Sequence, residues 1–234
     1  MASMAYSQDE ETRSLSSFSK ISAHEAIDVF IKAGSKEEAR IVSDSHDLDE
    51  VLTEVSGDRL KIHLEGNNHR NVDVKVYVTY KSIDAISASS AASLSSEGTI
   101  QAYGDFDVDV SSAGDIQTRI TGVDELNIDA SSAGDARLEV DAKEVEADVT
   151  SAGDVEIAGT AGSLDVEVSS SGDFDGYDLE CEEVEASASS GGGAKVYASK
   201  KLRGRASSGG SVRYKGNPEY VDTNSSSGGS IRKS

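Results

Sequence analysis

The stretch "SSAGDARLEVDAKEVEADV", residues 131–149, holds the pattern that decides the fold. Apolar and polar residues alternate strictly after Gly134-Asp135, and they alternate again over the last part of the stretch. A period of two on either side of a break predicts two half-buried β-strands joined by a bend. The apolar positions are Ala136, Leu138, Val140, Ala142, Val145, Ala147 and Val149.

The same pattern returns along most of the chain. Its corner sequence, Ser-Ser-Ala-Gly-Asp or a close variant, recurs at intervals of 22, 20, 19, 19, 20, 18 and 19 residues, counted from Ala92, which stands where the first glycine is missing. Because the apolar positions keep their offsets in each repeat, they stack in register when the repeats lie above one another. The corner glycines are Gly114, Gly134, Gly153, Gly172, Gly192, Gly210 and Gly229.

A repeat of about 19–20 residues with two strands and two corners is one coil of a β-solenoid. One coil cannot bury its apolar face alone, but the coils above and below complete the core. We therefore predict an all-β chain folded as a parallel β-helix, right-handed like most crossovers between parallel strands. The alternative is a β-sandwich of hairpins. Hairpins favour Asn-Gly or Asp-Gly turns and variable spacing, so the fixed Gly-Asp spacing favours the solenoid.

The chain divides into three parts by its pattern. Residues 91–234 carry the regular coils, and residues 18–90 have a less regular strand pattern, which predicts the first coils and a cap over the open strand edge. We expect these two parts to form a single domain. Residues 1–17 are expected to be a flexible segment, containing either the remnant of a trimmed signal peptide or an added sequence.

Within the N-terminal part, most apolar runs alternate as strands do. The exception is 47–55, in which acidic residues precede apolar ones at helical spacing, so we expect a short helix or turn there. The expected strands are 26–34, 39–44, 59–65 and 71–80.

The repeated corner has three competing interpretations, of which the first is structural. Glycine adopts a positive φ that other residues avoid, the aspartate bonds nearby backbone amides in the turn, and the preceding serine points inward and joins a stack of hydroxyl groups. These serines are Ser112, Ser132, Ser151 and Ser170.

The second interpretation is weak cation binding by the corner aspartates. They would stack one coil apart and repel each other, and a hard cation such as calcium would relieve that repulsion. Later coils replace the aspartate by Gly193, Ser211 and Ser230, so a continuous ion ladder is not required and we predict neither a metal site nor a cofactor. The weak candidates are Asp115, Asp135, Asp154 and Asp173.

The third interpretation is catalysis by paired carboxylates. Outward-facing acids are spread evenly over the strand faces, as on any solvated surface, and no group of them interrupts the repeat. We therefore predict no catalytic residue and a protein that is not an enzyme. The outward acids are Asp107, Asp109, Glu139, Glu146, Asp148, Glu156, Asp165 and Glu167.

Charge is distributed unevenly along the chain. The net charge is −21, which argues against nucleic-acid binding, whereas residues 191–234 contain nine Lys and Arg against two Asp and Glu. This basic region either meets an anionic polysaccharide or lipid head group, or is a solvated face that offsets the acidic coils. Its residues considered for this role are Lys195, Lys200, Lys201, Arg203 and Arg205.

The remaining composition excludes several features. The single cysteine, Cys181, rules out an intrachain disulfide, and the alternation places it outward beside Glu180 and Glu182, whose charges would raise the pKa of the thiol. All four histidines lie at or before His69, so the regular coils contain no histidine site. No window approaches 18 consecutive apolar residues, so no transmembrane helix is expected.

The repeats and the C-terminal segment "SSGGSVRYKGNPEYVDTNSSSGGSIRK" resemble the bacterial family called "putative auto-transporter adhesin, head GIN domain". The matching features are an opening strand with Phe18 and Ile21 and a Y-x-G-x-P segment at 214–218, and the likeness extends to Lys233. The corner at 89–94 departs from the pattern because it lacks the glycine. The resemblance implies a right-handed parallel β-helix exported to the periplasm, the outer membrane or the exterior, without catalytic residues.

These observations predict a non-enzymatic β-solenoid of the cell envelope that adheres to a glycan or another surface polymer. Repeated outward side chains at about 4.8 Å suit a repetitive ligand. A polysaccharide-active enzyme and a scaffold that polymerises through its ends remain as alternatives. The oligomeric state stays open, a monomer included.

The repeat predicts unequal tolerance to substitution at the corner. Gly114→Val should damage folding because a bulky residue replaces the turn glycine, whereas Asp115→Ser should be tolerated because Ser211 and Ser230 stand at the same place in other coils. Thermal unfolding of the two variants measures this difference. Equal loss of stability in both variants would contradict the prediction.

Overall fold

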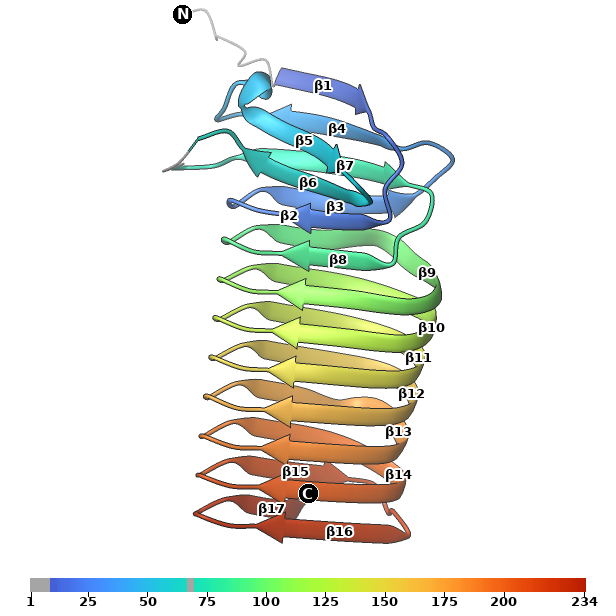
Figure 1. Cartoon of the computed structure of the whole chain (residues 1–234), viewed down its shortest axis with the longest axis vertical. Helices are drawn as coiled ribbons and strands as arrows, with labels where there is room; N and C mark the ends of the chain where they lie inside the picture. Colours follow the sequence, from blue (N-terminus) through green and yellow to red (C-terminus); the bar gives the residue numbers. More distant parts are fainter. Residues whose placement is uncertain (1–8, 67–69) are drawn as a thin grey trace, which may run out of the picture.

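The computed structural model describes residues 9–66 and 70–234 and shows a rod of stacked β-coils (Figure 1). Successive coils pair strand to strand in parallel, which confirms the predicted β-solenoid. The strands are β1 (Asp9–Ser14), β2 (Lys20–Ala23), β3 (Asp28–Ala33), β4 (Glu38–Ser43), β5 (Val51–Ser56), β6 (Arg59–Leu64), β7 (Val74–Tyr80), β8 (Ala85–Ala88), β9 (Ser93–Val110), β10 (Asp115–Ala130), β11 (Asp135–Val149), β12 (Asp154–Val168), β13 (Asp173–Ala188), β14 (Gly193–Ala206), β15 (Ser211–Lys215), β16 (Tyr220–Ser225) and β17 (Ser230–Lys233).

Each long strand from β9 to β14 bends once and so lies on both faces of the rod. In β11, Arg137 and Glu139 project from the half that follows the glycine corner, which we call face A, and Glu146 and Asp148 project from the half that precedes the next corner, which we call face B. Face B is turned toward the viewer in Figure 1, where its ribbons end in arrowheads. We call the bend between the halves the far corner.

The core fills the space between the two faces with rows of identical register. One row runs down face A from Ile116 through Ala136 and Val155 to Phe174, all without exposed surface. Burying a large apolar side chain contributes about 1.5–3 kcal/mol, and each coil adds several such side chains to the rows. The strict alternation in the sequence therefore follows from a core to which each coil adds one layer of apolar side chains.

The glycine corner differs from the prediction in its dihedral angles. Positive φ falls on the two residues before the glycine, at 51° for Ser112 and 60° for Ala113, and not on Gly114. The amide of Ala113 thereby turns along the rod and donates a hydrogen bond of 3.1 Å to the carbonyl of Ser132 in the next coil. As a result the serines point to solvent, so the predicted inward stack of hydroxyl groups is wrong. The exposed serines are Ser112, Ser132, Ser151 and Ser170.

Glycine is required at the corner by contact between coils. A Cβ on Gly114 would lie 2.4 Å from the carbonyl oxygen of Ala88, and one on Gly134 would lie 2.6 Å from that of Val110. No real Cβ makes contacts this short, so the backbone of each corner is pressed against the coil before it. The aspartate that follows does not hold the turn, since the carboxylate of Asp115 accepts a hydrogen bond from Arg137 on the next coil.

The N-terminal part caps the solenoid with antiparallel strands. β1 pairs with β4, β4 pairs with β7, and β5 pairs with β6. Two predictions are corrected here. Residues 9–14 form β1 although they fell in the expected flexible segment, of which residues 1–8 lie outside the described part. The expected helix at 47–55 is a single 3-10 turn at Leu48–Glu50 followed by β5, because the hairpin with β6 takes up its apolar residues.

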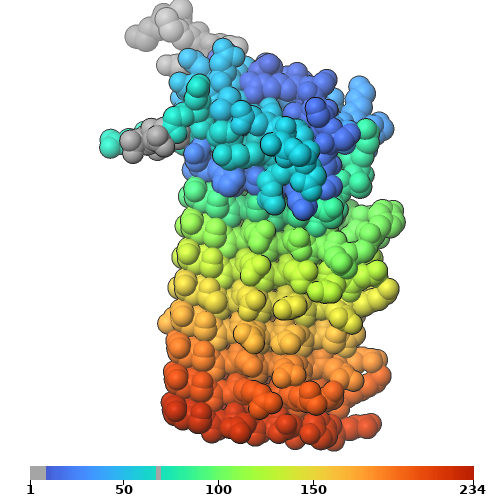
Figure 2. All heavy atoms as spheres, in the orientation of Figure 1, coloured from blue at the N-terminus to red at the C-terminus, as the bar shows by residue number. Residues whose placement is uncertain are grey.

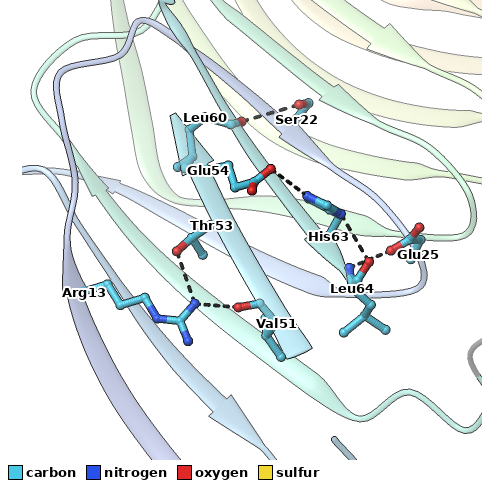
Figure 3. A network of polar contacts seen from close by, with 9 residues as sticks. All are labelled: Arg13, Ser22, Glu25, Val51, Thr53, Glu54, Leu60, His63 and Leu64. Atoms are coloured by element: carbon cyan, nitrogen blue, oxygen red, sulfur yellow. Dashed lines mark hydrogen bonds and ion pairs between the residues drawn. The ribbon is translucent and has the colours of Figure 1, made fainter. Parts of the chain in front are cut away.

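Arg13 covers the backbone edge at the capped end (Figure 3). Its guanidinium donates hydrogen bonds to the carbonyl oxygens of Val51 and Leu48, the latter at 2.8 Å, and contacts Glu11 at 2.7 Å. A free strand edge invites pairing with another chain, and a charged side chain placed over the carbonyls prevents it. Arg13 therefore blocks this part of the strand edge at the N-terminal end of the rod.

Substitutions at the corner of β11 separate the two roles found there. Gly134→Ala should lower the free energy of unfolding by about 1–3 kcal/mol, because its Cβ overlaps the carbonyl of Val110. Ala133→Gly should change it by less than about 1 kcal/mol, because relief of the positive φ offsets the greater freedom of the unfolded chain. Denaturant unfolding of both variants tests this, and a larger loss for Ala133→Gly would contradict it.

Candidate functional site

The four corner aspartates first considered as weak metal ligands form one column on face A. The guanidinium of Arg137 lies 3.1 Å from the carboxylates of Asp115 and Asp135. The ammonium group of Lys195 lies 3.6 Å from the carboxylate of Asp173. Burial, together with the carboxylates above and below it, raises the pKa of Asp154. Within the described ranges no group of three or more His, Cys, Asp or Glu is arranged to hold a metal ion. The column is Asp115, Asp135, Asp154 and Asp173.

Coil β9 departs from the regular repeat by forming two bulges against β10. Residues 96–98 stand opposite Thr118 alone, and residues 102–103 stand opposite Gly122 alone. Gly98 and Gly104, at φ 106° and 116°, let the backbone leave the strand direction. Light-green atoms of this coil stand out from the side of the rod in Figure 2.

The first bulge is held from inside the coil. Thr118 is a buried polar residue at an inward position that other coils fill with Leu138 or Ile157. Its hydroxyl donates a hydrogen bond of 2.8 Å to the hydroxyl of Ser96, which in turn donates to the carbonyl of Gly98 at 2.8 Å. The bulge is thus a built feature of the fold.

Face A is hollowed beneath this bulge, with a volume of about 560 Å³. The bulge forms the upper wall, and Ala158 leaves space in the column where Arg119 and Glu139 stand in the coils above. Gln117, Arg137 and Glu156 also line the hollow, and the floor includes Leu138. We call this hollow the face A cleft.

Charges of both signs alternate around the face A cleft. Arg119 forms an ion pair with Glu139, and the guanidinium of Arg137 lies 3.9 Å from the carboxylate of Glu156. These four side chains are between 48% and 69% exposed, and exposed ion pairs contribute only about 0–1 kcal/mol. They can therefore exchange partners with a ligand that offers both hydrogen-bond donors and acceptors.

The second bulge presents an aromatic side chain to solvent. Tyr103 is 88% exposed. The side-chain amide of Gln101 fixes the backbone beside it by donating a hydrogen bond of 3.2 Å to the carbonyl of Thr121. An aromatic ring held out on a fixed bulge is a surface for stacking. Sequence reasoning missed both bulges, although the interval of 22 residues before Gly114 was the longest of the series and was their signal.

Face B carries stacked rows of acidic side chains. They lie in register along successive coils. Burial first, and then the neighbouring carboxylates, raise the pKa values of Asp109, Asp129 and Asp165. The two rows nearest the glycine corner contain Asp107, Glu146, Asp165 and Glu185 in one and Asp109, Asp129, Asp148 and Glu167 in the other.

The basic residues of coil β14 mostly contact the acids of the coil above them. These contacts favour the interpretation that the basic region offsets the negative charge of the acidic coils. Arg205 differs, since no acidic partner lies within ion-pair distance of it among the described residues. The pairs are Lys195–Asp175 at 2.8 Å, Lys200–Glu182 at 2.6 Å, Lys201–Glu183 at 2.7 Å and Arg203–Glu185 at 3.6 Å.

Cys181 is buried, which corrects its predicted outward position. Strand β13 contains a bulge near Tyr177, where its pairing with β12 shifts, and the shift moves the following residues to the opposite register. Burial raises the pKa of Cys181 to about 12. The thiol is therefore unreactive, for a different reason than the neighbouring charges first considered.

The fold and its surfaces define a class: a parallel β-solenoid capped at its N-terminal end by antiparallel strands, with charged faces and a cleft under a bulged coil. The family model described as "Putative auto-transporter adhesin, head GIN domain" matches residues 17–218, and the chain belongs to that family. The resemblance drawn from the sequence is confirmed. A search of curated proteins found no match.

Solved structures share this fold over nearly the whole chain. A "putative adhesin" from Parabacteroides merdae is 17% identical, with 98% of this chain and 97% of that chain covered and a TM-score of 0.89. A "putative adhesin" from Parabacteroides distasonis is 21% identical, with 97% of each chain covered and a TM-score of 0.89. A "putative lipid binding protein" from the same species is 18% identical, with 98% and 97% covered and a TM-score of 0.84.

At these identities the likeness establishes the fold. Among the described residues, no helix has the length and apolar character needed to span a membrane.

The acidic rows of face B predict a pH-dependent stability. The folded pKa of Asp129 is raised above its unfolded value, so the stability linked to its protonation is present below about pH 4 and is lost as pH rises through the folded pKa. Asp129→Asn should therefore raise the thermal midpoint at pH 7 by roughly 1–3 °C, with the gain vanishing near pH 3. A lower midpoint for the variant at pH 7 would contradict this.

Proposed function

We propose that the chain is a non-enzymatic, exported protein of the cell envelope that adheres to a glycan or another surface polymer along face A. The observation that carries the proposal is the face A cleft under the bulges of β9. It interrupts a series of otherwise similar coils and brings side chains of both charges around the apolar floor at Leu138. Membership of the adhesin family supports an exported location and a role in binding.

The chemistry of the cleft suits a sugar. Sugar hydroxyl groups donate and accept hydrogen bonds, and Gln117, Arg137 and Glu156 provide both kinds of partner. The C–H face of a pyranose packs on apolar or aromatic surface, for which Leu138 and the nearby bulge with Tyr103 are available. A polymer lying along the rod would meet the same backbone spacing, about 4.8 Å, at every coil.

A polysaccharide-active enzyme is the second candidate, because an enzyme of this kind is expected to have a mixed-charge groove beside an enlarged coil. Its general acid, however, needs burial to hold a proton at neutral pH. The side chains of Glu139 and Glu156 are 55% and 69% exposed. This exposure favours adhesion over hydrolysis.

A scaffold that polymerises through both ends is less favoured. Such a scaffold needs an uncapped first coil, whereas Arg13 and the antiparallel strands cap the N-terminal end.

Binding to a glycan array and to bacterial cells tests the proposal. The wild-type protein should bind a defined set of glycans above a charge-matched control protein, and Arg119→Gln/Arg137→Gln should weaken that binding by about tenfold or more. Arg203→Gln/Arg205→Gln removes the same charge from face B and should bind as the wild type does. No signal on either assay contradicts adhesion, and release of reducing ends from a bound glycan supports the enzyme instead.

A further inference from the structure

The last two glycine corners carry a shared sequence that the preceding coils lack. It reads Gly-Gly-Ser-Val-Arg at 209–213 and Gly-Gly-Ser-Ile-Arg at 228–232. Serine occupies the position that coils β10 to β13 fill with aspartate, and an arginine follows two residues later on the same face. A repeated change from an acid to a hydroxyl beside a new guanidinium indicates a local change in the charge of the ligand that face A meets.

The two copies stand directly above one another. Ser211 pairs with Ser230, and Arg213 pairs with Arg232, in the parallel register of β15 and β17. Neighbouring strands lie about 4.8 Å apart, so two guanidinium groups are stacked one coil apart, an arrangement that destabilises a sheet unless an anion joins it. All four residues project from face A, and both arginines are exposed.

The charges of this pair are not balanced by an acid in the part of the chain that the structure describes. Over the ranges that the structure describes, neither Arg213 nor Arg232 has a carboxylate within ion-pair distance. Four of the five basic residues of the preceding coil, among them Lys195 and Lys201, are by contrast held by an acid of β13, and Arg205 is the fifth. Arg213 and Arg232 differ from other basic residues without an acidic partner, such as Arg205, because they stand at the same register position of two neighbouring coils.

A second hollow adjoins the arginines. It has a volume of about 300 Å³ and is lined by the glycines at and before the start of β14 together with Asp173, Lys195, Ser211 and Arg213. Gly193 stands in its wall at the column position that aspartate fills in β10 to β13. The carboxylate column thus ends in the wall of the hollow at Asp173, which pairs with Lys195, and the hydroxyl of Ser211 and the guanidinium of Arg213 line the side toward the last coils.

Donors of this kind recognise an oxoanion. A guanidinium donates two parallel hydrogen bonds to a carboxylate, phosphate or sulfate, and a serine hydroxyl adds a third. Because the Ser-x-Arg pair repeats once per coil, the site presents two such donor sets along the rod axis. A linear polymer with one acidic group on each residue matches that repeat better than an isolated anion does.

We propose that Ser211, Arg213, Ser230 and Arg232 form a binding site for an acidic polysaccharide on face A of the last coils. This inference deepens the proposed function, because it names the charge of the polymer and adds a contact separate from the face A cleft. A strand of such a polymer runs along the rod and exchanges its counterions for the two arginines. The acidic coils above then limit how far along face A a polyanion extends.

Polygalacturonate, with one carboxylate per sugar, is the probe for this site, and its fully methyl-esterified form is the uncharged control. The full chain should bind polygalacturonate more tightly, and added salt should weaken this binding. Arg213→Gln/Arg232→Gln should lower the affinity for polygalacturonate about tenfold or more and leave binding of the esterified polymer unchanged. Ser211→Ala/Ser230→Ala should give a smaller loss in the same direction. Thermal unfolding of each variant verifies that it is folded.

Matched variants separate this site from general charge and from the cleft. Arg203→Gln/Arg205→Gln makes the same change in charge on face B and should retain wild-type affinity. An equal loss in both pairs of variants overturns the site in favour of nonspecific attraction. Binding to phosphatidylglycerol vesicles without binding to polygalacturonate overturns the choice of polymer.

If Arg119→Gln/Arg137→Gln alone abolishes glycan binding, the proposed function stands and this inference fails. If Arg213→Gln/Arg232→Gln alone does so, the inference stands and the cleft is displaced.

Discussion

The contact on which the structure depends is the approach of each glycine corner to the carbonyl of the coil before it. At Gly114 the space for a Cβ is already taken by the oxygen of Ala88. This closeness lets the coils lie at β-sheet spacing at their tightest bend, so that the strands on both sides can pair in parallel register. Two left-handed residues before the glycine complete the bend and direct the amide of Ala113 toward the following coil. A larger residue at Gly114 would have to displace the carbonyl of Ala88.

Regular stacking also governs the electrostatics. Every outward side chain has a counterpart at the same register position one coil away. Where the sign of the charge changes between two coils, opposite charges therefore lie next to each other along the rod. Arg137 contacts aspartates of its own coil and of the coil above, and the basic side chains of β14 contact the acids of β13. At Asp129, burial first and then the carboxylates of neighbouring coils raise the pKa of the side chain. The surface therefore consists of bands of charge, each one or a few coils wide.

Much of the fold could be predicted from the sequence, because alternation and constant spacing are direct consequences of a layered core. The predictions failed where one extra residue altered the register. The bulge near Tyr177 moved Cys181 from the surface to the core, and the bulge of β9 at 96–98, which Thr118 holds through Ser96, forms the upper wall of the cleft. An insertion of one or two residues is visible as a longer interval, but its position within the coil depends on backbone angles that no pattern of side chains records. The positive φ before the glycine was missed for the same reason.

The capped N-terminal end also differs from the regular coils in how it assembles. There the chain joins β1 to β4, β4 to β7 and β7 to β3. Each later coil contacts mainly the one before it, as β17 contacts β15, and adds its layer at a small cost in loop entropy. Folding can therefore start at any regular coil and proceed coil by coil, whereas the cap has to join segments that are distant in the sequence. The coils with stacked arginines lie at the other end of the rod, where β17 pairs with β15 alone among the described strands.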